Sequence, residues 1–123
     1  MIVSSARVMD LYFKTEMTRD VDAILGLFAP SAVFQTPDAV RKGHDDIRPF
    51  YEDAAKRFPH LSVSVTRAFT DGAFEIAEWS AVMTDPEGRE VPLEGVNIAQ
   101  VDAESSRIDA MRSYYDVSSY VRP

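Results

Sequence analysis

The sequence predicts an α+β fold in which helices dominate the first half and a long antiparallel sheet forms the second. Through most of the first 58 residues, apolar side chains recur every three or four positions, the spacing of a helix with one buried face. From residue 61 onward, apolar side chains recur at every second position, which is typical of strands. Nothing in the 123 residues repeats and no linker interrupts them, so we expect a single domain over residues 1–123.

Two helices are expected before the first strand. The first covers about residues 6–17, and Ser4-Ser5 can cap its N-terminus. The second begins at Asp20, a favourable N-cap residue, and Phe28 falls on its buried face. We expect Pro30 to end this helix, because proline lacks the N–H that a helix needs.

A short strand over residues 32–36 and a third helix over about 45–58 follow. The segment His44-Asp45-Asp46 at the start of this helix resembles an acid/base cluster or a metal site. However, acidic side chains at a helix start satisfy free backbone N–H groups and complement the helix dipole. The other histidine, His60, lies beyond the helix end, so we interpret the segment as a helix cap and expect no metal site.

Four long strands complete the predicted sheet. They cover residues 61–69, 73–84, 90–101 and 107–116. Both faces of the second of these strands are substantially apolar, so both are expected to be covered. Helices would cover one face, and we expect a second subunit to cover the other, making a homodimer through the outer face of the sheet.

Composition excludes several classes of partner. Thirteen basic and twenty acidic residues leave a net charge of −7, which repels phosphate backbones and anionic lipid headgroups. We therefore expect neither nucleic acid nor membrane as a partner. The chain has no cysteine, and its N-terminus shows no signal-peptide pattern. These features favour a soluble, cytoplasmic protein.

Four polar residues interrupt apolar patterns and are candidate site residues. Tyr12 and Tyr51 lie on the apolar faces of two helices, either as core aromatics or as a pair of phenols serving a ligand oxygen. Glu78 and Asn97 stand within apolar strand faces. Because an unpaired buried carboxylate is costly, Glu78 is expected to be salt-bridged, solvated, or held with a raised pKa for proton transfer.

Local phrases along nearly the whole chain resemble those of a known superfamily. The phrases are MTRDVDAILGLFAPSAVFQTP, KGHDDIRPFYED, AEWSAV and RIDAMRSYYD. They resemble the nuclear transport factor 2-like superfamily, in particular its SnoaL-like polyketide cyclase and ketosteroid isomerase-like branch. The resemblance implies a cone-shaped roll of three N-terminal helices packed in a strongly curved, mixed but mainly antiparallel sheet. It also implies a deep apolar pocket and a dimer.

The resemblance further implies which side chains face the pocket. On the strands these are Phe34, Thr36, Glu78, Ser80, Val82, Gly95, Asn97, Ala99, Met111, Ser113 and Tyr115. Of these, the expected ligand-binding residues are Phe34, Thr36, Ser80, Met111, Ser113 and Tyr115, together with Phe50 and Tyr51 on the third helix.

In the ketosteroid isomerase branch, an aspartate moves a proton while a tyrosine and a carboxylic acid hold the substrate oxygen. The resemblance places Tyr12 as that tyrosine, Tyr51 as its support and Asn97 at the carboxylic acid position. Thr36 stands at the position of the base and cannot accept a proton from carbon without a stronger base nearby. Glu78 is then the expected inward carboxylate.

Together these features predict a pocket protein for a small, largely apolar molecule. As an enzyme it would be a cofactor-free isomerase, cyclase or dehydratase acting by proton transfer on a carbonyl-containing polyketide-, steroid- or terpenoid-like compound. Tyr12, Glu78 and Asn97 would be its catalytic residues. The alternative is a non-catalytic ligand-binding or accessory dimerisation domain that has lost the base of its relatives.

Overall fold

The computed structural model describes residues 6–116 as three helices and one six-stranded sheet. In chain order the elements are α1 (Arg7–Met17), α2 (Val21–Leu25), β1 (Phe28–Thr36), β2 (Ala39–Lys42), α3 (His44–Arg57), β3 (His60–Asp71), β4 (Phe74–Thr84), β5 (Glu90–Val101) and β6 (Ile108–Tyr115). The strand order is β2-β1-β6-β5-β4-β3, and of the neighbouring pairs only β1 and β6 run parallel. The predicted α+β class and the mixed, mainly antiparallel sheet are therefore confirmed.

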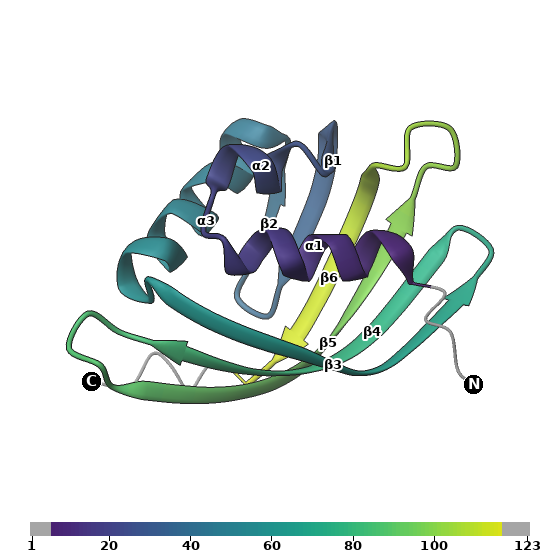
Figure 1. Cartoon of the computed structure of the whole chain (residues 1–123). Helices are drawn as coiled ribbons and strands as arrows, with labels where there is room; N and C mark the ends of the chain where they lie inside the picture. The colour runs from purple at the N-terminus through teal and green to yellow at the C-terminus, as the bar shows by residue number, and fades with distance from the viewer. Residues whose placement is uncertain (1–5, 117–123) are drawn as a thin grey trace.

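The sheet curves around the helices. Figure 1 shows the long strands β3, β4 and β5 bending beneath α1, which lies across their concave side. Helices α2 and α3 lie together at one end, near β1 and β2. The expectation of three N-terminal helices is correct only in part, because α3 follows the β1–β2 hairpin.

The segment after α2 differs from its predicted structure. The helix ends at Leu25, and Phe28 is the first residue of β1 rather than part of a helix face. Phe28 is fully buried in β1, and its apolar side chain at helical spacing from Ile24 and Leu25 is why helical periodicity included it. Pro30 lies inside β1, where the pairing with β6 is interrupted between Phe28 and Val33. Proline is tolerated there because the interrupted ladder needs no N–H donor.

Strand β2 was not predicted. Its four residues pair with β1 in an antiparallel hairpin, and Thr36 lies opposite Ala39 across the turn. Four residues are too few to show a period of two, so this segment looked like a loop.

The helix starts only partly follow the predicted caps. The Asp20 carboxylate accepts the N–H of Ala23 at 3.1 Å, as predicted. At α3 the N-cap residue is Gly43, and His44-Asp45-Asp46 forms the first turn of the helix. The prediction that this segment is the cap was therefore wrong, because the helix begins one residue earlier than expected. Asp45 and Asp46 still place negative charge at the positive end of the helix. The predicted cap Ser4-Ser5 lies outside the described residues.

A buried carboxylate from the sheet holds the first turn of α1. Glu75 of β4 accepts the backbone N–H of Met9 at 2.8 Å and that of Val8 at 3.3 Å. Ala6, the residue at the N-cap position, has no side chain that could do so. Glu75 therefore caps α1 from a distant part of the chain.

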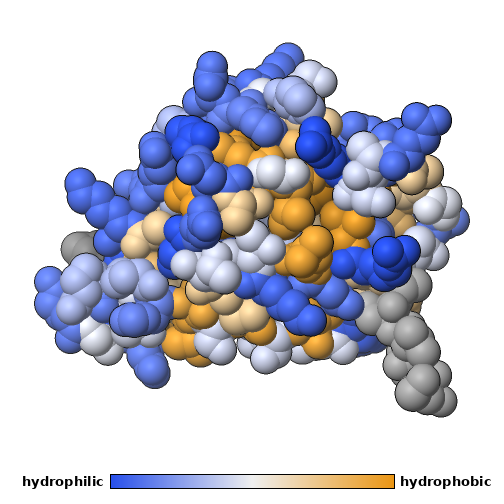
Figure 2. Space-filling view, turned by 45° about the horizontal axis from the view of Figure 1, so that its top comes forward, coloured by the Kyte–Doolittle hydropathy of each residue, from blue (hydrophilic) through white to orange (hydrophobic). Residues whose placement is uncertain are grey.

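The core fills the space between the helices and the concave face of the sheet. Its largest fully buried side chains are Tyr51, Phe28, Phe34, Met9, Ile24, Ile47, Ile108 and Met111. Figure 2 shows a largely hydrophilic surface with apolar side chains exposed in its middle. None of the helices within residues 6–116 could span a membrane.

Candidate functional site

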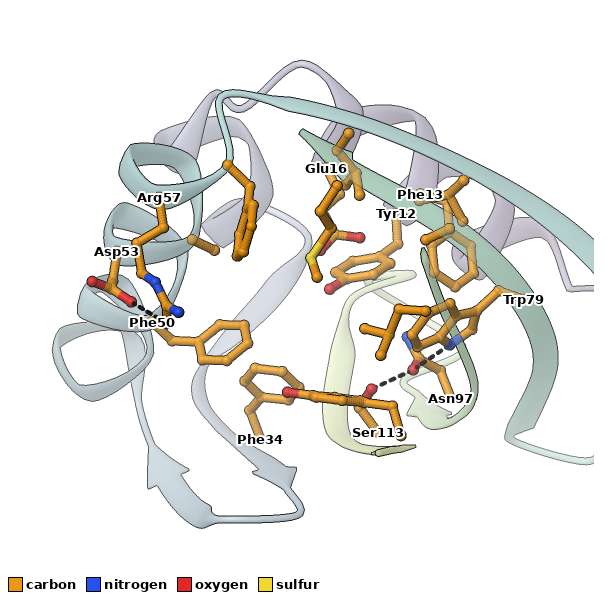
Figure 3. Close-up of a pocket in the computed structure, with 18 of the residues that line it drawn as sticks. Tyr12, Phe13, Glu16, Phe34, Phe50, Asp53, Arg57, Trp79, Asn97 and Ser113 are labelled. Atoms are coloured by element: carbon orange, nitrogen blue, oxygen red, sulfur yellow. Dashed lines mark hydrogen bonds and ion pairs between the residues drawn. The ribbon is translucent and has the colours of Figure 1, made fainter. Parts of the chain in front are cut away.

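A cavity of about 340 Å³ opens between α1, α3 and the concave face of the sheet. Its aromatic lining residues are Tyr12, Phe13, Phe34, Phe50, Phe58, Trp79 and Tyr115, and its ionisable side chains are Glu16, Arg19, Asp38, Arg41, Asp53 and Arg57. Figure 3 shows side chains from helices and strands converging on this space. An apolar wall with a few convergent polar groups is the usual construction of a small-molecule site.

Two phenols meet in the wall of the cavity. The hydroxyl oxygens of Tyr12 and Tyr51 lie 2.6 Å apart, and either can be the donor. Tyr12 lines the cavity, while Tyr51 lies behind it with its ring stacked on Phe34. Burial raises the pKa of both phenols well above the ordinary value of 10, and the negative charge of Glu16 adds to the shift. Both remain neutral hydrogen-bonding groups at physiological pH.

The amide of Asn97 has a fixed orientation. Its Oδ1 accepts hydrogen bonds from the indole Nε1 of Trp79 at 3.0 Å and from Ser113 Oγ at 2.6 Å, as the dashed lines in Figure 3 show. An indole N–H only donates, so the atom facing it must be the amide oxygen. Among residues 6–116, the partner of the amide nitrogen is then the sulfur of Met111 alone, at 3.7 Å. Because sulfur is a weak acceptor, Asn97 keeps donor capacity for a ligand oxygen.

Glu78 lies outside the cavity, which corrects the expectation that it faces inward. In the β4–β5 register, Asn97 is opposite Ala77, so Glu78 and its alternate neighbour Ser80 belong to the outer face of the sheet. The Glu78 side chain is 39% exposed and forms an ion pair with Arg67 at 2.8 Å. Val82 also lies on this outer face.

The error has a physical cause. Both faces of β4 carry apolar residues, so the pattern of this strand does not determine which face is buried, and a shift of one residue exchanges the two faces. On the neighbouring strands the expected orientation is correct. The residues facing inward there are Phe34, Thr36, Gly95, Asn97, Ala99, Met111, Ser113 and Tyr115.

Three of the expected ligand-binding residues lie behind the lining rather than in it. Tyr51, Met111 and Thr36 are buried but do not line the cavity. The Thr36 hydroxyl donates to Asp38 Oδ1 at 2.7 Å and accepts from Arg41 Nη1 at 3.0 Å. Both of these charged partners line the cavity, so Thr36 positions groups that can reach a ligand.

Glu16 is a carboxylate of the site that the sequence reasoning missed. It stands four residues after Tyr12 on α1, on the same helix face, and reaches toward the Tyr12 ring in Figure 3. Burial raises its pKa from 4.5 to about 7, while the Arg19 charge and the Tyr12 hydroxyl act in the opposite direction. The signal that could have found it is this four-residue spacing from a candidate catalytic tyrosine.

The site therefore combines a carboxyl group that titrates near neutral pH with oxygen-binding groups on two sides. Tyr12 stands beside Glu16 on α1, and Asn97 projects from β5. Such an arrangement can hold a carbonyl or hydroxyl oxygen and move a proton close to it. No group of three or more His, Asp or Glu side chains within residues 6–116 is arranged to hold a metal ion.

Solved structures with the same architecture are numerous. One is a protein from Catenulispora acidiphila with a ketosteroid isomerase-like fold, in complex with trimethylamine; its TM-score is 0.83 at 14% identity, over 95% of this chain and 90% of that one. Another is SalBIII, an epoxide hydrolase/cyclase-like enzyme of pyran ring formation in the polyether salinomycin. Its TM-score is 0.79 at 22% identity, over 92% of this chain and 91% of that one. A third is an LEH-like epoxide hydrolase from M. tuberculosis. Its TM-score is 0.78 at 18% identity, over 94% of this chain and 85% of that one. At these identities the likeness concerns the fold alone.

The fold and the cavity define a cone of the nuclear transport factor 2-like class. The model of the SnoaL-like domain matches residues 9–111, and the chain belongs to that family. No curated protein matches the chain in sequence.

Proposed function

We propose that this protein is a cofactor-free isomerase or cyclase that moves a proton within a small, largely apolar compound carrying a carbonyl or hydroxyl group. The observation that carries the proposal is Glu16, a carboxyl group with a pKa of about 7 beside the Tyr12 phenol in an apolar cavity. A group with a pKa near the working pH both accepts and returns a proton efficiently. The SnoaL-like family and the cyclase among the structural neighbours support the same class of reaction.

Each group has one role in the proposed reaction. Tyr12 and Asn97 donate hydrogen bonds to the substrate oxygen, and Tyr51 supports Tyr12. Glu16 removes a proton from the carbon next to the carbonyl and returns it to another atom of the same molecule, so no second reactant is required. Glu16 thereby takes the role that Glu78 was expected to play. The size and lining of the cavity suit a polyketide-, steroid- or terpenoid-like skeleton.

Deuterium exchange tests the proton transfer on simple ketones that stand in for the substrate. The protein is incubated in D2O with a panel of small apolar ketones, and NMR follows exchange at the carbon next to the carbonyl. We expect catalysed exchange whose rate rises as pH passes through about 7, where Glu16 loses its proton. Glu16→Gln should abolish it, whereas Glu78→Gln, on the outer face, should leave it unchanged. Full exchange activity in Glu16→Gln would sink the proposal.

A second candidate function is non-catalytic ligand binding. It is favoured by Thr36, which stands where the ketosteroid isomerase branch has its base and is tied to Asp38 and Arg41. Native mass spectrometry of the purified protein separates the two functions. A compound recovered unchanged from the cavity, together with no exchange on any ketone, favours binding alone.

We also propose a homodimer through the outer face of the sheet. That face carries the apolar side chains Ile76, Val82, Val96 and Ile98, and the more exposed Phe69, Phe74 and Tyr114. Polar residues such as Glu78 and Arg67 lie among these side chains, but so many exposed apolar groups on one face favour an interface. Sedimentation analysis should give twice the chain mass for the natural protein and a lower mass for Val96→Asp. A monomer at micromolar concentration would contradict this assembly.

A further inference from the structure

The cavity is lined by as many arginines as acidic residues, although the chain as a whole is acidic. Three arginines line it, Arg19, Arg41 and Arg57, while the chain carries a net charge of −7. Three acidic residues line it as well, but Glu16 is only partly ionised at neutral pH because burial raises its pKa to about 7. The cavity is therefore a place where a negative group meets less repulsion than elsewhere on the protein.

The three arginines differ in what they already bind. Arg57 forms an ion pair with Asp53 at 3.8 Å. Arg19 donates from Nε to the backbone oxygen of Phe58 at 3.0 Å and interacts with Glu16. Arg41, by contrast, forms no ion pair with any carboxylate in the described part of the chain. Its link to an acidic group runs through the Thr36 hydroxyl, which separates it from Asp38.

The Arg41 side chain is held in place. Its guanidinium lies over the ring of Phe50, 4.7 Å from the ring centroid, and Nη1 donates to Thr36 Oγ1 at 3.0 Å. Stacking on an aromatic face leaves the edge of the guanidinium open, and that edge carries five N–H donors. One donor is used by Thr36, so the others can bind a planar acceptor. A carboxylate matches this fork with two parallel hydrogen bonds.

The position of Arg41 suits one end of an elongated ligand. Arg41 is half-buried, and the neighbouring Asp38 and Asp53 are exposed although they line the cavity, so this side is its opening. Phe34 and Phe50 form an edge-to-face aromatic pair directly inside it. In Figure 3 these two rings lie on the side of the cavity opposite Trp79 and Asn97. An apolar body can therefore extend from Arg41 past these rings toward Tyr12 and Asn97.

We propose that Arg41, stacked on Phe50 and bound to Thr36, is a carboxylate-binding subsite at the opening of the cavity, and that the natural ligand is an apolar monocarboxylic acid. This inference deepens the proposed function by naming the substrate class. The carboxylate lies at Arg41, and the reacting carbonyl or hydroxyl lies at the opposite end, near Glu16.

The test compares two ligands of the same shape, 3-cyclohexylpropanoate and its neutral amide. Neither absorbs in the near ultraviolet, and Trp79, the single tryptophan of the chain, lines the cavity and reports binding by its fluorescence. We expect the carboxylate to bind the natural protein about tenfold more tightly than the amide, because each hydrogen bond to a charged group is strong. Calorimetry provides the same constants independently of the fluorescence.

Substitutions then test whether Arg41 causes the preference for the carboxylate over the amide. Arg41→Met should bind both ligands alike, with the affinity for the amide unchanged, and Arg41→Lys should keep only part of the preference. Arg48→Gln removes an arginine that pairs with Asp22 outside the cavity, and it should behave like the natural protein. Thermal unfolding checks that each variant is folded, and Arg41→Lys provides the answer should Arg41→Met fail to fold.

Several outcomes would overturn the proposal. These are equal affinities for acid and amide in the natural protein, a preference that survives in Arg41→Met, and no binding of the carboxylate at millimolar concentration. Tighter binding of the matching ammonium compound would also overturn it and would assign the opening to Asp38 and Asp53 instead. Because binding is measured without turnover, loss of the carboxylate preference is separate from a failure of the deuterium exchange.

Discussion

The hydroxyl oxygens of Tyr12 and Tyr51 lie 2.6 Å apart although the two residues come from different helices and are 39 positions apart in the chain. Both side chains are almost completely buried, and only Tyr12 reaches the cavity. A phenol that donates to a ligand oxygen while accepting from a second phenol is a stronger donor than an isolated one. The relationship thus connects the core of the fold to the binding of a ligand.

Tyr51→Phe removes that second hydroxyl and keeps the ring. The buried Tyr12 hydroxyl loses its partner, so we expect a loss of about 1 kcal/mol in the free energy of unfolding. Catalysed deuterium exchange should fall about tenfold, because Tyr12 becomes a weaker and less fixed donor. Tyr114→Phe, on the outer face of the sheet and away from the cavity, is the matched control and should leave the catalysed exchange unchanged. Unaltered exchange in Tyr51→Phe would remove Tyr51 from the proposed machinery.

The raised pKa of Glu16 predicts how stability depends on pH. The folded protein holds the proton with a pKa of about 7, against 4.5 for an ordinary glutamate, so protonation favours the folded state. This contribution is fully present below about pH 4.5, declines as pH rises and is absent above about pH 7. Glu16→Gln mimics the protonated form at every pH. At pH 8 it should therefore be more stable than the natural protein by about 1–3 kcal/mol.

Urea unfolding at pH 4.5, 6 and 8 measures this effect as the difference between the two proteins. The difference should grow with pH up to about 7 and then stay constant. Glu52→Gln, at an exposed position of α3, controls for the loss of one negative charge. A variant that gains stability while losing activity would show that Glu16 is kept for the reaction rather than for the fold. A difference that does not change with pH would contradict the raised pKa.

Glu75 and Glu78 provide a second comparison between two glutamates of one strand. Glu75 is buried and accepts two backbone N–H groups of α1, whereas Glu78 pairs with Arg67 at the surface. Glu75→Gln places an NH2 group against one of those donors, and we expect a loss of about 1–3 kcal/mol in the free energy of unfolding. Glu78→Gln should change that energy by less than about 1 kcal/mol. Equal losses measured by urea unfolding would contradict the distant cap on α1.

The sequence predicted the fold more fully than the site, and particular residues show why. Fold class follows from periodicity, and periods of three to four and of two are strong over α1, α3 and β3–β6. The short strand β2 has too few residues to show a period. The face of β4 was predicted wrongly because each face has enough apolar residues to be buried, so only the pairing of Ala77 with Asn97 settles it.

The charged part of the site was the least predictable. Glu16 and Arg41 meet the cavity only after α1 and the β1–β2 hairpin are placed around it, and both resemble ordinary surface residues in the sequence. Polar residues inside apolar strands attract attention, whereas charged residues at the edge of an amphipathic helix do not. Asn97 was found for the first reason, and Glu16 was missed for the second.

Gly95 makes the position of Trp79 sensitive to a single methyl group. The two residues are opposite each other in the β4–β5 pairing, and a Cβ added at Gly95 would overlap the Trp79 ring and the backbone oxygen of Tyr114. Gly95→Ala should therefore cost about 1–3 kcal/mol of folding free energy through overpacking. It should also shift the Trp79 emission, because the ring must move to admit the new Cβ and its hydrogen bond to Asn97 is disturbed.

Gly26→Ala is the matched control for this substitution. An added Cβ there meets only ordinary contacts, the nearest at 3.4 Å, and Gly26 has a φ of −62°, which alanine adopts without strain. This variant should be as stable as the natural protein or more stable by about 0.4–1 kcal/mol, since alanine reduces the freedom of the unfolded chain. Ligand affinity should fall in Gly95→Ala alone, because the orientation of the Asn97 amide depends on the indole N–H. If the Trp79 emission and the affinity both stay unchanged in Gly95→Ala, the glycine is not needed to position the ring.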